Sequence, residues 1–246
     1  MARTLILRAP GTNGDQETAY AFQRVGAKSA EIVHLNRILE KPEILGQSDI
    51  LCIPGGFSFG DDIRAGKIFA AKIRHSLSGL MQTFCDEGKL ILGIGNGFQV
   101  LLKLGLFGNS NKMTLAKNTP PRFTDRWVRL QTNPSKCVFL KGIESLYLPV
   151  AHAEGRFVTQ NPEDLSVLRK KQQLPLCYVP AENPDGSAEN VAGVCDESGR
   201  VFGLMPHPER YIDPVQHPHW TRLGTCSPEG DGLALFRNAV HHMRAN

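Results

Sequence analysis

The sequence contains no long hydrophobic run and no secretion signal. No stretch approaches the roughly 18 consecutive apolar residues of a membrane-spanning helix. The apolar stretch near the N-terminus, Leu5-Ile6-Leu7, is also too short for a signal peptide. Both absences predict a soluble, cytoplasmic protein with no membrane partner.

Cysteine spacings typical of metal sites or disulfide frameworks are also missing. The chain has six cysteines, but no CxxC pair and no Cys/His pattern of metal ligands. Several lie in apolar runs such as Leu51-Cys52-Ile53, so we expect reduced, buried thiols and no metal site. The cysteines are at positions 52, 85, 137, 177, 195 and 226.

No dense patch of one charge is present. The net charge is +4, and the densest basic run, Arg169-Lys170-Lys171, has no aromatic residues interleaved for stacking on bases. Such a run is typical of a solvated surface turn, and the sequence predicts no nucleic-acid partner.

Internal repeats, linkers and low-complexity segments are absent as well. A chain of 246 residues that is 41% hydrophobic can bury one sizeable core. We therefore expect residues 1–246 to form a single domain.

What is present is an alternation of short apolar runs and longer amphipathic segments in the first part of the chain. We expect strands at 4–9, 30–35, 49–54 and 89–94, and helices at 15–25, 64–85 and 98–106. This alternation builds a parallel sheet covered by helices on both faces.

The chain after residue 106 carries short strand-like runs punctuated by Pro and Gly. These runs predict a mainly antiparallel extension of the sheet, and Asp231 and Gly232 mark the start of a terminal helix at 231–243. The fold class is therefore α/β, with a mixed, mainly parallel sheet. The expected later strands are 127–132, 146–150, 176–179, 191–195 and 201–205.

The strand at 89–94 runs into the turn Gly93-Ile94-Gly95-Asn96-Gly97, after which the chain resumes as a helix. A sharp, glycine-flanked turn between strand and helix is the geometry of a nucleophile elbow. There the central residue projects from the carboxyl end of the sheet, and helical N–H groups point at an oxyanion. Position 95 should then carry Ser or Cys, but it carries Gly.

Two other interpretations of this turn stay open on these residues alone. A dinucleotide-binding loop is disfavoured, because the third glycine of GxGxxG would fall at Phe98 and no acidic residue occurs near position 113. A plain tight turn, whose glycines only let helix and strand approach each other, also fits.

A second group of polar residues follows the strand at 201–205. In Met205-Pro206-His207-Pro208-Glu209-Arg210 the prolines favour extended backbone, so His207 and Glu209 should face the same side. A carboxylate beside an imidazole fixes its tautomer and stabilises its protonated form, as a base serving a thiol nucleophile requires. Taken alone, such a pair is also typical of a structural hydrogen bond.

Together with the loop at 54–61, these segments resemble the class I glutamine amidotransferases, and more closely the glutaminase subunits of phosphoribosylformylglycinamidine synthase in purine biosynthesis. The resemblance implies a flavodoxin-like fold, glutamine as substrate, and two partners, a large synthetase subunit and a small accessory subunit. It implies no cofactor in this chain, with ATP and Mg in the synthetase partner. The matching stretches are 10–13, 55–66, 93–99, 151–157, 183–187 and 203–210.

The resemblance also implies roles for individual residues. The family forms a glutamyl thioester at the elbow and passes the released ammonia to the synthetase. His207 matches the general base and acid, Glu209 its orienting carboxylate, and the backbone N–H groups of Gly56 and Asn96 the oxyanion hole. The positions that match glutamine-binding residues are Phe57, Ser58 and Gln99.

The chain departs from the family at the nucleophile, because the family has Cys where Gly95 stands. Cys85 ends the preceding helix and Cys52 lies in a buried strand, so neither can substitute, and we predict no glutaminase activity. Gly95 is either an engineered replacement or a natural variant that kept its place in a complex. The family also commonly has Cys at Gly14 and Gly at Ala153.

Two functions of other classes stay open beside this one. The first is a non-catalytic subunit that stabilises or regulates a synthetase, and the second is a cysteine hydrolase that uses another thiol. The charged run Asp61-Asp62-Ile63-Arg64 is a candidate contact for a partner subunit, although acidic residues are more typical of a helix start.

Overall fold

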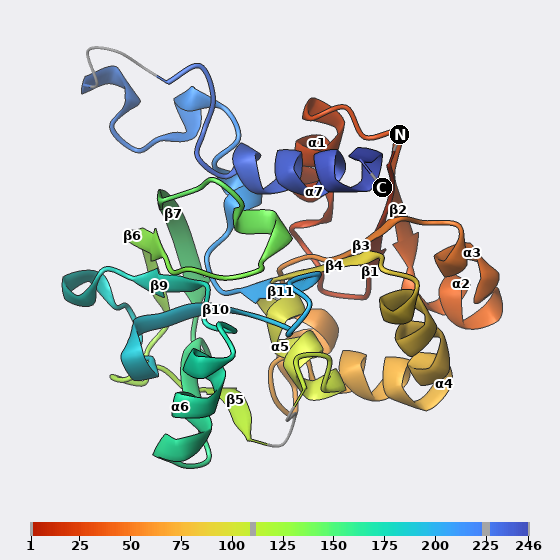
Figure 1. Ribbon diagram of the computed structural model, residues 1–246, viewed down its shortest axis with the longest axis horizontal. Coiled ribbons are helices and arrows are strands. Elements are labelled where there is room, and N and C mark those ends of the chain that lie inside the picture. Colours follow the sequence, from red (N-terminus) through yellow and green to blue (C-terminus); the bar gives the residue numbers. More distant parts are fainter. Residues whose placement is uncertain (1, 109–111, 223–226, 246) are drawn as a thin grey trace.

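The computed structural model describes residues 2–108, 112–222 and 227–245, and a nine-stranded mixed sheet runs through its centre (Figure 1). The strand order is β2-β1-β3-β4-β11-β10-β9-β6-β7. The first five strands in this order pair in parallel with their neighbours. The pairs from β11 onward, up to β7, are antiparallel. The strands are β1 (Arg3–Arg8), β2 (Ser29–His34), β3 (Ile50–Ile53), β4 (Leu90–Ile94), β6 (Thr124–Thr132), β7 (Ser145–His152), β9 (Leu176–Tyr178), β10 (Val191–Cys195) and β11 (Val201–Leu204).

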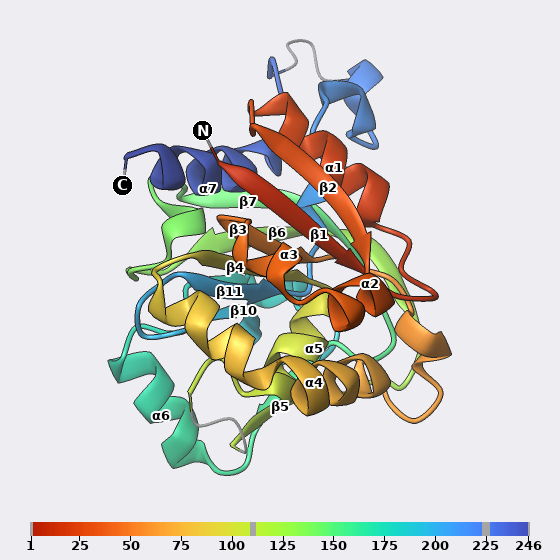
Figure 2. The same cartoon turned by 90° about the vertical axis from the view of Figure 1, so that its right-hand side faces the viewer.

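Helices cover both faces of the parallel part (Figure 2). Alternate side chains of β1 point to opposite faces: Ile6 packs in the cluster that includes α1 (Asp15–Arg24) and α7 (Leu233–Ala245). Leu5 packs in the other cluster, with α4 (Lys67–Asp86) and α5 (Asn96–Leu104). The predicted α/β class and the mainly antiparallel extension are therefore confirmed.

Several short elements were not predicted. The helices are α2 (Leu35–Glu40), α3 (Glu43–Gly46) and α6 (Pro162–Lys170), and a second sheet pairs β5 (Met113–Ala116) with β8 (Arg156–Thr159). Each is too short for a periodic pattern to stand out from its flanks. The prediction of a turn at Arg169-Lys170-Lys171 was wrong, because Arg169 and Lys170 form the last turn of α6.

Three predicted helices begin at other residues than expected. The terminal helix α7 begins at Leu233, two residues after the predicted start. α4 begins at Lys67, because Gly66 before it has a left-handed φ of 68°. Asp61 accepts a hydrogen bond from the Gly66 N–H, which favours the helix-start interpretation of the acidic run. α5 begins at Asn96, directly after the turn, so the first helical N–H groups are closer to position 95 than predicted. In the part of the chain that the structure describes, no helix is both long and apolar enough to span a membrane.

Candidate active site

A cavity of about 340 Å³ lies where strands of the parallel sheet end. Gly56 follows β3, Gly95 follows β4 and His207 follows β11, and all three line the cavity. In open α/β sheets, ligands bind outside the carboxyl ends of the strands. The sheet topology therefore brings the two sequence motifs, far apart in the chain, to one place.

The glycines of the turn serve different purposes. A β-carbon on Gly97 would lie 1.8 Å from the Ile53 carbonyl oxygen, and one on Gly93 would lie 2.6 Å from Leu101 Cδ1. These two glycines let α5 approach the sheet, as the plain-turn interpretation expects. Gly95 differs, because the atoms nearest to its β-carbon would be those of the His207 ring, at 3.1 and 3.3 Å, and Gly55 Cα at 3.8 Å.

The backbone of Gly95 has the shape of an elbow. Its φ is 51° and its ψ is −109°, a conformation that strains residues with a side chain. Its N–H donates to the Leu204 carbonyl at 2.8 Å, which ties the turn to β11. Asn96 is the first residue of α5, so its N–H has no acceptor within the helix. The dinucleotide loop, in contrast, gains no support from this geometry.

His207 and Glu209 form a buried pair next to the turn. His207 Nδ1 and Glu209 Oε1 are 2.7 Å apart, and the two residues are 3% and 1% exposed. With the carboxylate accepting from Nδ1, the lone pair of the neutral ring is on Nε2. Nε2 would lie 3.3 Å from a β-carbon on Gly95, so the basic nitrogen faces the tip of the turn.

The extended backbone predicted for this segment was only partly right. His207 is extended, with φ −105° and ψ 90°, but Pro208–Arg210 forms a single 3₁₀ turn. Proline fits the first position of a helical turn, because its fixed φ is helical and it has no N–H to satisfy. The turn places the Glu209 carboxylate beside the imidazole.

The loop after β3 also approaches the turn closely. Gly56 has a φ of 145°, and a β-carbon there would lie 2.7 Å from both the Gly11 carbonyl oxygen and the Asn13 nitrogen. Phe57 follows it and is 47% exposed at the cavity rim, where its ring centroid is 6.5 Å from that of Phe123. Only glycine fits at position 56, because this loop packs backbone against backbone.

Asn96 and its neighbours form a hydrogen-bonded chain along one wall. Asn96 Oδ1 accepts from the Ser58 hydroxyl at 2.5 Å, and Asn96 Nδ2 donates to Asp61 and to Gln99 Oε1. Gln99 Nε2 in turn donates to the Glu154 carbonyl oxygen at 2.6 Å. Asn96 and Gln99 line the cavity, whereas Ser58 is buried behind it.

Six of the eight residues proposed from the sequence line the cavity, and Glu209 and Ser58 lie behind them. The sequence-based selection missed other lining residues, namely Asn13, Asp61, Ala65, Phe123, Asp125, Ala151, His152, Ala153, Glu154, Met205 and Arg210. The stretch 151–157 is one of those that resemble the family, but the resemblance assigned no role to its residues. Gly14, where the family commonly has Cys, lies next to Glu209: a β-carbon at Gly14 would be 3.2 Å from Glu209 Oε1.

His152 is a second buried histidine of this cavity. Asn118 Nδ2 donates to the His152 carbonyl, so Asn118 Oδ1 is the acceptor and His152 Nδ1, 3.1 Å away, donates to it. The other ring nitrogen faces Asp185 Oδ2 at 3.6 Å. Burial, and to a lesser extent the nearby His207, lower the pKa of His152 to about 4, whereas burial raises the pKa of Asp185.

We expect the His152 ring to stay neutral at pH 5. Its folded pKa of about 4 lies below the ~6.5 of an unfolded chain, so only the unfolded state gains this proton as the pH falls from 6.5 towards 4. This group alone should lower the free energy of unfolding by about 2 kcal/mol between pH 7 and pH 5. Asp185, with its raised pKa, acts in the opposite sense.

The measurement is an NMR titration of the ring, combined with urea unfolding of the parent chain and of His152→Gln at both pH values. The loss of stability on acidification should be smaller in the variant. An imidazole that titrates near 6.5 would contradict this prediction.

No cysteine among the described residues lies at this site. None lines the cavity, and burial raises the pKa of the thiols of Cys52, Cys137 and Cys177. Cys85 is half-buried, with its pKa raised to about 11 mainly by burial. Cys226 lies outside the described residues.

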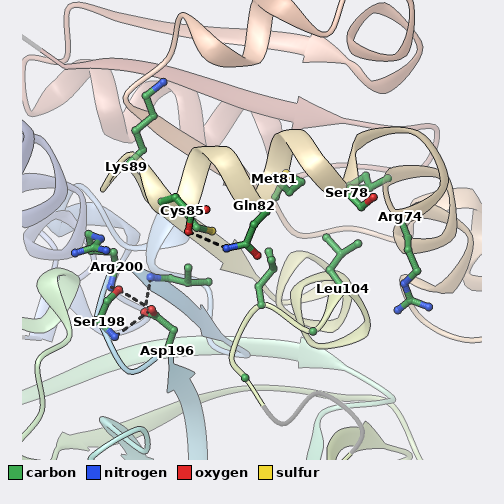
Figure 3. Close-up of a pocket in the computed structure, with 16 residues that line it drawn as sticks. Arg74, Ser78, Met81, Gln82, Cys85, Lys89, Leu104, Asp196, Ser198 and Arg200 are labelled. Carbon is green, nitrogen blue, oxygen red and sulfur yellow. Dashed lines mark hydrogen bonds between the residues drawn. The ribbon is translucent and has the colours of Figure 1, made fainter.

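Cys85 belongs to a different cavity (Figure 3). This second cavity, of about 490 Å³, is lined by the end of α4 and by Lys89 and Arg200, which precede β4 and β11. It therefore lies at the amino ends of these strands, opposite the His207 cavity. Across the described ranges, no group of three or more His, Cys, Asp and Glu residues could hold a metal ion.

Comparisons with known proteins agree with this geometry. A family model described as "CobB/CobQ-like glutamine amidotransferase domain" matches residues 1–243. A protein of Dehalococcoides mccartyi named "Phosphoribosylformylglycinamidine synthase subunit PurQ" is 45% identical, over 98% of each chain. One of the same name from Methanococcus maripaludis is 38% identical, over 98% of this chain and 97% of its own.

Solved structures show the same likeness. A chain in the structure of PurLQS from Thermotoga maritima superimposes with a TM-score of 0.78 at 31% identity, covering 99% of this chain and 100% of that one. A glutamine amidotransferase from Thermotoga maritima shares the fold, with a TM-score of 0.60 at 14% identity over 100% and 99% of the two chains. The chain therefore belongs to the family of CobB/CobQ-like glutamine amidotransferases.

Proposed function

We propose that this chain is the glutaminase-type subunit of a phosphoribosylformylglycinamidine synthase, that it acts in purine biosynthesis in the cytoplasm, and that it does not hydrolyse glutamine as it stands. The observation that carries the proposal is the position of the His207 Nε2 atom. It faces the place where a side chain at position 95 would begin, 3.3 Å from the β-carbon of that side chain, and Gly95 leaves this place empty.

The roles of the residues follow from this arrangement. With a thiol at position 95, His207 would take its proton and later give it to the leaving ammonia, while Glu209 orients and stabilises the imidazolium. The N–H groups of Gly56 and Asn96 would bind the oxyanion, each worth about 3 kcal/mol in the transition state. Phe57 and Gln99 would contact glutamine, and Ser58 would act by holding Asn96.

Without the thiol the reaction stops before its first covalent step. No thioester forms, and the amide of a bound glutamine stays intact. Cavity, dyad and helix N-terminus are nevertheless all in place, which supports a site that still binds glutamine.

The proposal treats residues 1–246 as one glutamine amidotransferase domain. The family match over 1–243 supports this, as does the continuous sheet from β2 to β7. The partners would be a large synthetase subunit and a small accessory subunit, and the synthetase would hold ATP and Mg. The complex named PurLQS, in which a chain similar to this one occurs, supports an assembly of this kind.

A second candidate function is a purely structural or regulatory subunit of the synthetase. Gly95 favours it, because a synthetase supplied with free ammonia needs no thiol in this subunit. Under this alternative the cavity would carry no ammonia-producing chemistry, and the chain would matter through assembly alone.

The experiment is reconstitution with the synthetase and accessory subunits of the same organism, followed by synthesis with ammonium or with glutamine as nitrogen source. We expect a complex that uses ammonium and makes negligible product from glutamine, because loss of a catalytic nucleophile costs around a millionfold in rate. Isothermal titration should still detect glutamine binding to this chain. A normal glutamine-driven rate would contradict the proposed inactivity, and failure to assemble would contradict the proposed partners.

A further inference from the structure

Cys137 and Cys195 are neighbours in space, although they lie far apart in the chain. Cys195 is the last residue of β10, and Cys137 directly precedes the 3₁₀ turn Val138–Leu140. The Cys137 thiol is hydrogen-bonded to the Cys195 thiol, and the Cys195 thiol donates in turn to the Gln172 carbonyl oxygen at 3.8 Å. Two sulfur atoms in such contact need only a small movement to reach the about 2.05 Å of a disulfide bond.

The backbone around the two cysteines holds them in this contact. The turn that follows Cys195 packs against the segment before Val138, whose N–H donates to the Gly199 carbonyl at 2.9 Å. A β-carbon on Gly199 would lie 2.0 Å from the Lys136 carbonyl oxygen and 2.9 Å from the Cys137 nitrogen. Packing of backbone against backbone leaves these segments little room to separate. The meeting of the two thiols is therefore a property of the fold.

The two thiols differ in how a small molecule can reach them. Cys137 lines a cavity of about 1100 Å³, between the chain that joins β6 to β7 and the last turns of α7. Cys195 is 1% exposed and is not part of this lining. A small oxidant would therefore meet Cys137 first. Burial, and then the hydrogen bond to Cys195, raise the pKa of the Cys137 thiol, so it stays protonated at neutral pH and reacts slowly.

Cys177 offers a comparison within the same chain. It is also buried, and it lines a cavity of about 440 Å³. Its sulfur accepts a hydrogen bond from Asn133 Nδ2 at 3.3 Å, and this amide takes the place that a second thiol has at Cys137. Cys177 therefore has access to a small oxidant without a thiol to complete a disulfide.

From these contacts we propose that Cys137 and Cys195 form a redox modification site, at which a peroxide produces a disulfide that a dithiol can reduce again. The bond ties the segment before Val138 to the end of β10. Cys195 pairs with Phe202 near the amino end of β11, whereas His207 follows the carboxyl end. The site is therefore separate from the His207 cavity and does not depend on the proposed function.

The chemistry balances with the peroxide as the oxidant. The Cys137 sulfur attacks one peroxide oxygen and the O–O bond breaks, which gives a sulfenic acid and a hydroxide that leaves as water with the thiol proton. The Cys195 sulfur then forms a bond to the Cys137 sulfur. The S–O bond breaks, and the second hydroxide leaves as water with the proton of Cys195. The two thiols lose two electrons, and the peroxide gains them.

The test exposes the unchanged chain to hydrogen peroxide at mildly alkaline pH, which increases the thiolate fraction. Remaining thiols are alkylated in denaturant, and the chain is mapped by mass spectrometry of its peptides without reduction. We expect a linked peptide that joins Cys137 to Cys195 and is lost after dithiothreitol. The midpoint of thermal unfolding should rise by about 10 °C, because the bond closes a long ring in the unfolded chain.

Single substitutions give a second readout. Cys137→Ala and Cys195→Ala should each abolish both the linked peptide and the rise in the midpoint. Cys177→Ala is the matched control and should keep both, because the Cys177 sulfur is bonded to Asn133 and not to a thiol. Thermal unfolding of each variant without peroxide shows whether it folds.

The map of the unchanged chain decides the matter even where a variant fails to fold. Two free thiols after treatment would overturn the inference, as would a sulfinic acid at Cys137 without a linked peptide. A bond from either cysteine to a different one, such as Cys226, would also contradict it. A linked peptide with an unchanged midpoint would show that the bond does not tie the two segments in the folded chain.

Discussion

A Gly95→Cys variant is expected to hydrolyse glutamine roughly a millionfold faster than the unchanged chain, as judged from the loss when a catalytic nucleophile is removed. The new Cβ would begin 3.3 Å from His207 Nε2, so the thiol can reach the base that activates it. The measurement is ammonia release from glutamine by the complex with the synthetase, before and after the substitution.

The variant should also be slightly less stable. The φ of 51° at position 95 suits glycine, and a side chain there costs roughly 1 to 3 kcal/mol of stability. Gly79→Cys is the matched control, because a β-carbon at Gly79 meets nothing within 4 Å and the residue is exposed on α4. A Gly95→Cys chain that folds, binds glutamine and stays inert would contradict the site assignment.

Removing the imidazole from the Gly95→Cys variant is expected to abolish the restored activity. His207→Ala in that background should lower glutamine turnover by about 10⁴-fold or more, because the nucleophile and its base act as a unit. Glu209→Gln should lower it less, since Glu209 acts only through the ring, 2.7 Å from Nδ1. The measurement is the rate constant of turnover at saturating glutamine.

His75→Ala in the same background controls for loss of any histidine, because this residue is exposed on α4. Glutamine affinity should change little in all of these variants. A His207→Ala variant that keeps most of the turnover would show that another group serves as the base.

The sequence was sufficient to locate the elements that form the candidate active site. The continuous apolar strand before Gly93 and the glycine-flanked turn identified the elbow, and β4 and α5 are found on either side of it. The spacing of His207 and Glu209 suggested a shared direction, and the structure places their side chains in contact. Each of these patterns involves residues that are close together in the chain, so it can be recognised in a single sequence.

Features that depend on contacts between distant segments could not be predicted from the sequence. Ser58 resembled a glutamine-binding residue, yet its hydroxyl is held by Asn96, 38 positions later in the chain. His152 reaches the cavity only because β7 ends beside the backbone that follows β11, where the His207 N–H donates to the Pro149 carbonyl. No spacing rule relates these positions, because the pairing of the strands sets their distance.

The sequence left open whether the turn at 93–97 is a nucleophile elbow or a plain tight turn, and the geometry of its three glycines bears on this choice. Gly93 and Gly97 are required by close packing, since a β-carbon on either would lie closer than 3 Å to a neighbouring atom. No contact this close requires glycine at position 95. The atoms nearest to a β-carbon there would be those of the His207 ring, at 3.1 and 3.3 Å. This geometry fits the proposal that Gly95 stands where the family carries its nucleophile.

The relation between position 95 and His207 can be tested by intact-mass spectrometry after incubation with a glutamine-analogue electrophile. The unchanged chain and Gly79→Cys should gain no mass, and Gly95→Cys should gain one adduct that L-glutamine protects against. An adduct on the unchanged chain, or none on a folded Gly95→Cys chain, would contradict the arrangement described here.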